Sequence, residues 1–111
     1  MACTIQRSAA FDAAVEAQLA YLESQGRPGW IVRLRDELAE FEMGISTFPH
    51  MGRERDRDGT RVLRKMGLPK APFSVWYADD EAEPDAPITL LNFFHDRQRE
   101  RVPRLNAVAW R

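Results

Sequence analysis

Apolar residues recur every three or four positions between Pro28 and Pro49, and this periodicity constrains the fold of the chain more than any other feature. The residues are Trp30, Leu34, Leu38, Phe41, Ile45 and Phe48. Such spacing places side chains on one face of an α-helix. Proline is accepted in the first helical turn but blocks a later one. The sequence therefore predicts an amphipathic helix that begins at Pro28 and ends before Pro49.

A second helical face precedes this one, formed by Phe11, Val15, Leu19 and Leu22. Ser8 can cap the start of this helix, because its hydroxyl accepts a hydrogen bond from a free amide of the first turn. Gly26 can end it in the left-handed conformation. A short Gly-Arg-Pro link joins the two predicted helices, so we expect an antiparallel hairpin with a shared apolar seam.

After residue 49 the pattern changes from helix to strand. Three segments are rich in apolar, β-branched or aromatic residues and are predicted strands: 61–66, 73–78 and 88–94. Residues 51–60 and 79–87 are polar and are predicted loops. Trp76 alternates with its neighbours, so we expect it on the second face of the sheet, partly exposed, where a partner could lie.

These elements together predict an α+β fold in a single domain, residues 1–111. A short N-terminal strand at 3–7 and an antiparallel helical hairpin pack on a three- to four-stranded antiparallel sheet. Residues 95–111 form a basic C-terminal tail, predicted to be partly helical up to Pro103.

The charge of the chain is divided into blocks. The net charge is −1, from 16 basic and 17 acidic residues, which excludes a uniformly basic coat for nucleic acid. Residues 49–78 carry +4, residues 79–94 carry −5 and residues 95–111 carry +3. Two basic stretches thus flank an acidic one. Fourteen of the basic residues are arginine, whose planar fork suits phosphate and carboxylate groups.

The composition also excludes disulfide-bonded, cysteine-based metal-binding and membrane-spanning proteins. A single cysteine, Cys3, rules out an internal disulfide and a cysteine-based metal cluster. We expect no metal and no cofactor. No apolar run approaches the roughly 20 residues of a membrane helix, and the N-terminus has no secretory pattern. The sequence therefore predicts a cytoplasmic protein that does not bind membranes.

An ordered set of short motifs resembles the RelE/ParE superfamily, the small toxins of bacterial type II toxin–antitoxin modules. The set runs from about Ile5 to Gln98 and comprises Phe48-Pro49, Met51-Gly52-Arg53, Arg61-Val62-Leu63, Ser74-Val75-Trp76-Tyr77, Ile88-Thr89-Leu90-Leu91 and His95. The resemblance implies two helices against an antiparallel sheet. It also implies a cognate antitoxin that wraps and neutralises the toxin, and contact with DNA only through that antitoxin.

Two activities exist in the family, and the sequence favours one of them. ParE-like members inhibit DNA gyrase, whereas RelE-like members cleave messenger RNA on the ribosome. The ribonucleases are usually strongly basic and often carry a tyrosine near the C-terminus, but here no tyrosine follows Tyr77. The Gly52-Arg53 pair resembles the ParE-like branch. We therefore expect a gyrase inhibitor, with a ribosome-dependent ribonuclease as the alternative and a non-toxic binding module of the same fold as a third. Whether the chain is an enzyme depends on this choice.

The candidate site residues are basic or imidazole side chains. In a RelE-like ribonuclease, His95 would act as acid or base, and Arg61 and Arg64 would stabilise charge on the transferring phosphate. The non-functional alternatives are that His95 has a structural role and that Arg61 and Arg64 lie on a solvated edge strand. Alternation places Arg61 and Lys65 on one face of the strand and Arg64 on the other.

Further candidates for binding of target or RNA are Arg53, Lys65, Arg97 and Arg99. Each can contact a phosphate, or can equally be a solvated surface charge. His50, in the loop after the second predicted helix, is interpreted as structural.

Overall fold

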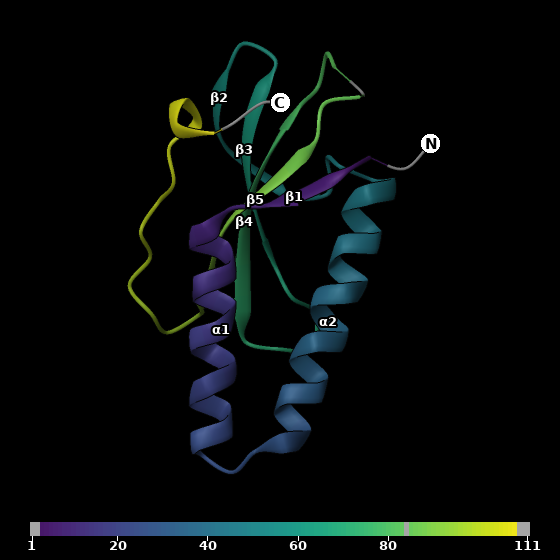
Figure 1. Ribbon diagram of the computed structural model, residues 1–111. Helices are drawn as coiled ribbons and strands as arrows, with labels where there is room; N and C mark the ends of the chain where they lie inside the picture. The colour runs from purple at the N-terminus through teal and green to yellow at the C-terminus, as the bar shows by residue number, and fades with distance from the viewer. Residues whose placement is uncertain (1–2, 84, 109–111) are drawn as a thin grey trace.

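A helical hairpin lies against one face of a five-stranded sheet, and the C-terminal segment crosses the other face (Figure 1). The computed structural model describes residues 3–83 and 85–108. The elements are β1 (Ile5–Arg7), α1 (Ala9–Ser24), α2 (Pro28–Thr47), β2 (Arg53–Asp58), β3 (Arg61–Gly67), β4 (Phe73–Asp80), β5 (Ile88–His95) and the short 3-10 helix η1 (Leu105–Ala107). The predicted α+β class is confirmed.

The strands are ordered β1-β5-β4-β3-β2 in the sheet. The pairs β2–β3, β3–β4 and β4–β5 are antiparallel, while β1 runs parallel to β5. The sheet has one strand more than the predicted upper limit of four, because β2 occupies the segment 51–60 that was predicted as a loop.

The strand β2 has the sequence RERDRD, with no apolar residue, and all six side chains are exposed. Nothing in its hydrophobic pattern indicates a strand. Its pairing with β3 comes from a two-residue turn after Asp58, in which Gly59 has a φ of 63°. Glycine at the first position of a two-residue turn is a known hairpin signal, since glycine tolerates positive φ. The turn at Gly59 therefore pairs β2 with β3 although β2 has no alternation of apolar and polar residues.

Both helices begin where the sequence predicts. The hydroxyl of Ser8 accepts a hydrogen bond from the amide of Phe11 at 3.1 Å, and α1 is followed by Gly26 at a φ of 63°. In α2 the predicted face is buried at Leu34, Leu38, Phe41 and Ile45. Phe48 is 64% exposed, contrary to the predicted register, because the helix ends at Thr47 and Phe48 lies outside its last turn.

Two apolar clusters hold the layers together, one on each face of the sheet. The larger cluster joins the helices to Phe73, Val75 and Tyr77 of β4. The smaller one joins Trp76 of the opposite face to the tail residues Leu105 and Val108. Trp76 is only 1% exposed, so the expectation of a partly exposed tryptophan was wrong. The chain's own tail covers it.

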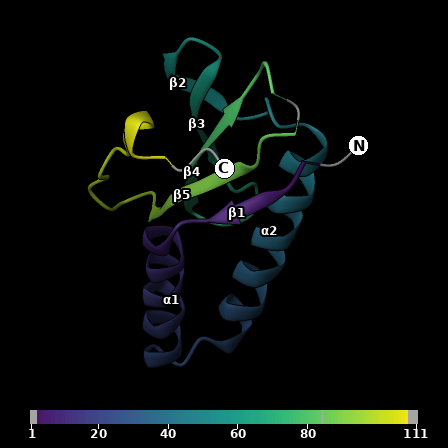
Figure 2. The same ribbon diagram turned by 45° about the horizontal axis from the view of Figure 1, so that its top comes forward.

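The tail is irregular where a partial helix was predicted before Pro103. It turns at residues 96–98, continues without regular structure, and forms η1 only after Pro103 (Figure 2). An ion pair of 2.6 Å between Lys65 and Glu100 ties it to β3. The tail is therefore held by contacts with the sheet and not by the hydrogen bonds of a helix. None of the helices in the described part of the chain is long and apolar enough to cross a membrane.

Candidate functional site

Among the described residues, the polar side chain with the most hydrogen bonds is Arg64, which β3 places beside Tyr77 of β4. Its Nε donates to Asp79 Oδ1 at 2.6 Å, and its Nη2 donates to Glu81 Oε2 at 2.8 Å. Its Nη1 donates to the carbonyl of Gly52 at 3.2 Å. The side chain is only 6% exposed. The guanidinium is therefore fully engaged within the protein.

His50 completes this network from the loop after α2. Its Nδ1 lies 2.9 Å from Asp79 Oδ2, and Asp79 is only 4% exposed. Nη2 of Arg64 lies 3.2 Å from the same Nδ1. Because the contact with Asp79 is shorter and its carboxylate can only accept, we assign the proton to Nδ1 of His50. The imidazole is 54% exposed, and Nε2 is then left as a hydrogen-bond acceptor. An imidazole oriented by a buried carboxylate is a suitable general base.

A further ion-pair group extends this network along β2. Arg57 donates to Glu54 Oε1 at 2.6 Å and to Glu81 Oε1 at 2.8 Å. The hydrogen bonds from Arg57 hold the pKa values of both glutamates below their usual range. Glu81 thus joins two arginines, Arg57 of β2 and Arg64 of β3. It links the charged β2 hairpin to the buried network.

Tyr77 lies beside Arg64 and binds the backbone of the loop between α2 and β2. Its hydroxyl donates to the carbonyl of Pro49 at 2.9 Å and accepts from the amide of Gly52 at 2.8 Å. Burial raises the pKa of Tyr77 to about 12. These two bonds hold the loop between α2 and β2 against the sheet, which sets the position of His50.

Gly52 has no room for a side chain at this contact. A Cβ atom there would lie 2.6 Å from the hydroxyl oxygen of Tyr77. Gly52→Ala is therefore expected to lower the free energy of unfolding by about 1–3 kcal/mol, the usual cost of overpacking. Gly29→Ala is the matched control, since its Cβ would meet nothing within 4 Å in α2. Urea denaturation of both variants measures the difference. Equal stability of the two would contradict the predicted clash.

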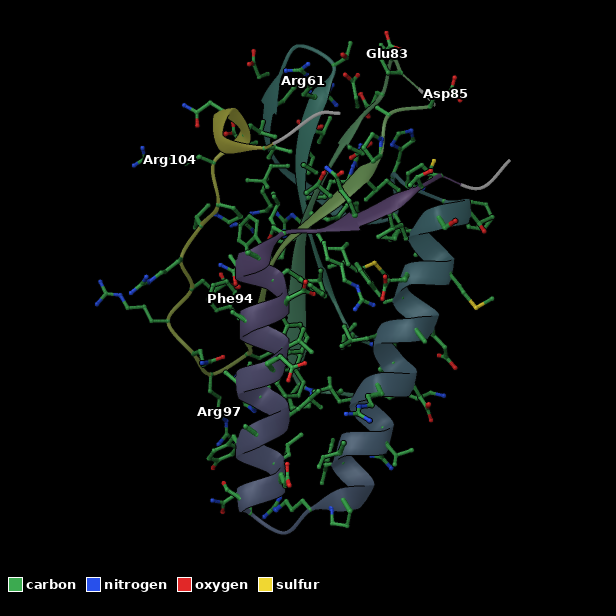
Figure 3. The ribbon with its side chains drawn as sticks, in the orientation of Figure 1. Arg61, Glu83, Asp85, Phe94, Arg97 and Arg104 are labelled. Carbon is green, nitrogen blue, oxygen red and sulfur yellow. The ribbon has the colours of Figure 1, made fainter. Side chains whose placement is uncertain are left out.

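The network borders a cavity of about 520 Å³ with an acidic lining. Five carboxylates contribute, from Asp79, Asp80, Glu81, Glu83 and Asp85. Figure 3 shows Glu83 and Asp85 on the connection between β4 and β5. A cavity with this charge repels a phosphodiester. Among the described residues, no group of three or more His, Cys, Asp or Glu side chains has the arrangement of a metal site.

Arg61 and Lys65 lie on the opposite face of β3 from Arg64, as alternation along the strand predicted. Arg61 pairs with Asp80 at 3.6 Å, and Lys65 lies over the ring of Trp76 at 5.6 Å. Arg53 is exposed and stands opposite Lys65 in the register of β2 and β3. β3 is not an edge strand, because β2 covers it.

The structure does not bring His95 together with Arg61 and Arg64. His95 pairs with Phe73 at one end of β4, while Arg61 pairs with Asp80 at the other end. Those two positions are seven residues apart along β4, a distance of roughly 20 Å. Arg97 and Arg99 are exposed in the turn and tail after His95. Figure 3 shows Arg61 at the tip of the β2–β3 hairpin and Arg97 far from it, beside α1.

Comparison of the sequence with protein-family models and with curated proteins finds no match. The resemblance to the RelE/ParE superfamily therefore rests on the residues given above. The network residues His50, Asp79 and Glu81 were not among the candidates. Their only sequence signal was an isolated histidine and an acidic run, neither of which indicates contact with Arg64.

Proposed function

We propose that this chain is the toxin of a type II toxin–antitoxin module that acts by binding its target, DNA gyrase, and not by cleaving RNA. A cognate antitoxin neutralises it, and both act in the cytoplasm. The motif set supports the toxin class. The fold supports it as well, since two helices packed on a largely antiparallel sheet are what the resemblance implies.

The observation that carries the choice of binding over cleavage is the placement of Arg64 and His95. Cleavage of the predicted kind needs His95 as acid or base together with Arg61 and Arg64 around a single phosphate. Arg64 is 6% exposed and bonded to two carboxylates, so it cannot reach a phosphate. His95 lies at the far end of β4 from Arg61.

The alternative general base, His50, does not restore a ribonuclease site. Its cavity is lined by five carboxylates, which disfavour approach of RNA. The exposed cations Arg53 and Arg99 suit contacts with an acidic protein surface. The basic groups are therefore assigned to binding.

The decisive experiment compares two activities of the purified chain. We expect inhibition of gyrase supercoiling in the presence of excess protein, and no cut in messenger RNA mapped by primer extension in a translation mixture. His95→Ala is expected to leave the inhibition unchanged. RNA cleavage that His95→Ala slows roughly 10²- to 10⁴-fold would instead establish the ribonuclease. Absence of both activities, with normal growth on expression, would identify a non-toxic binding module.

A further inference from the structure

A second cavity, of about 340 Å³, lies where the closed end of the helical hairpin meets the end of β5. Its volume falls in the range of small-ligand sites, roughly 300–1,000 Å³. Its walls come from α1, from the start of α2, from the start of β4 and from the turn after β5. It is separate from the network of Arg64 and from its acidic cavity.

The lining of this cavity is basic and aromatic. Arg27 and Arg97 contribute guanidinium groups, and Tyr21, Trp30 and Phe73 contribute rings. No acidic residue is in the lining, although the chain has more acidic than basic residues. Neither arginine has an ion-pair partner among the described residues, in contrast to Arg57 and Arg64. The cavity therefore favours an anion that also carries a flat apolar group.

His95 presents a directed donor at this cavity. Its Nδ1 accepts a hydrogen bond from the backbone amide of Arg97 at 3.1 Å. The proton of the neutral ring must then be on Nε2, the nitrogen that points away from that amide. The imidazole packs edge-on against Phe73, with 5.1 Å between the ring centres. A donor is thus held in place beside two cationic groups.

The walls are also tied to one another. The side-chain oxygen of Gln98 accepts from Gln18 of α1 at 2.8 Å and from the backbone amide of His95 at 2.7 Å. These bonds join the turn after β5 to the first helix. On the other side, Arg33 lies over the ring of Trp30 at 4.9 Å and holds its plane. A site ordered before binding loses less entropy when it is occupied.

We propose that this cavity binds a nucleoside phosphate. The base packs against Tyr21 and Trp30, since aromatic side chains stack on any base. The phosphate lies at Arg27, Arg97 and the Nε2–H of His95, which supply charge and direction. The same chemistry is present in a free nucleotide and in the phosphorylated end of a single strand. The site is independent of the proposed binding of gyrase, so either can fail without the other.

The test is a titration of the intact protein with adenosine monophosphate, followed by heteronuclear NMR. Adenosine and inorganic phosphate, the two halves of this ligand, are titrated separately as controls. We expect saturable shifts at Tyr21, Trp30 and His95, and affinity at least about tenfold higher for the nucleotide than for either half. Titration with a single-stranded oligonucleotide bearing a 5′-phosphate then distinguishes the two sources, since the better ligand identifies the natural one.

Two variants and a matched control localise the binding. Arg97→Gln is expected to weaken the nucleotide roughly 10- to 100-fold through loss of a charged hydrogen bond. Tyr21→Ala, at a side chain that is 60% exposed and so safe for folding, is expected to weaken it roughly 5- to 100-fold. Arg104→Gln removes an arginine of the same tail beside η1, away from this cavity (Figure 3), and is expected to change nothing.

Several results would overturn the proposal. No saturable shift up to roughly 10 mM nucleotide would do so, as would equal affinity for nucleotide and phosphate. An equal loss of nucleotide affinity in Arg104→Gln and Arg97→Gln would indicate that anions are attracted by the overall charge of the tail and not by this cavity. Stronger binding of an acidic peptide at the same residues would assign the cavity to a protein partner.

Discussion

Replacement of Arg64 with alanine is expected to lower the free energy of unfolding by about 3–5 kcal/mol. The guanidinium is the partner of Asp79, a carboxylate that is only 4% exposed. Without it, the buried carboxylate of Asp79 retains its contact with His50 but loses its ion-pair partner. Removal of one member of a buried pair is costly, because the other member remains desolvated and unpaired.

The matched control is Arg61→Ala, three residues earlier on the same strand. Arg61 pairs with Asp80 but is 48% exposed, and an exposed pair contributes about 1 kcal/mol or less. Chemical denaturation of the three proteins measures the difference. A further variant, Arg64→Met combined with Asp79→Leu, removes both charges and is expected to recover much of the loss. A loss in Arg64→Ala no greater than in Arg61→Ala would mean that the network does not stabilise the fold.

Tyr77→Phe is expected to lower the free energy of unfolding by about 2–3 kcal/mol at neutral pH. The substitution removes one hydroxyl and leaves the buried amide of Gly52 and the half-buried carbonyl of Pro49 without their partner. An unsatisfied buried group costs more than the hydrogen bond itself contributes.

The same substitution changes the response of stability to alkaline pH. Burial raises the pKa of Tyr77 to about 12, from an ordinary value of 10.0. Below pH 10 the phenol is protonated in both the folded and the unfolded chain. Between about pH 10 and 12 the unfolded chain loses this proton first, so stability falls as pH rises. The shift corresponds to about 3 kcal/mol at most.

The wild type and Tyr77→Phe are therefore expected to converge in stability as the pH rises from about 10 to 12. Urea denaturation at several pH values tests this, and ionisation of the phenol can be followed by its ultraviolet absorbance. Tyr21→Phe is the control at neutral pH, because that side chain is 60% exposed and its substitution changes stability little. A constant difference between wild type and Tyr77→Phe across this range would refute the raised pKa.

Much of the fold could be predicted from local patterns. The helical face from Leu34 to Ile45 and the cap at Ser8 both follow from short-range chemistry that the tertiary structure preserves. The strands 73–78 and 88–94 were equally clear, because buried strands need apolar and β-branched residues. The errors were at β2 and at the tail, where stability comes from pairing with β3 and from contacts with Trp76.

The candidate site was predicted less well than the fold. Alternation correctly separated Arg64 from Arg61 and Lys65. It gave no sign that Arg64 is buried, because burial of a charge depends on partners that lie distant in sequence. Asp79 is 15 residues away and Gly52 is 12 residues away.

The sequence by itself determined the helical hairpin, three of the strands and the blocks of opposite charge. Periodicity, caps and turns act over a few residues, so these features are local. Only the tertiary structure decided which charges meet. The registers of β3 on β4 and of β4 on β5 bring Arg64 to Asp79 and carry His95 to the opposite end of the sheet. Those registers depend on the packing of the whole core, because a shift of one residue would turn every buried side chain to the other face.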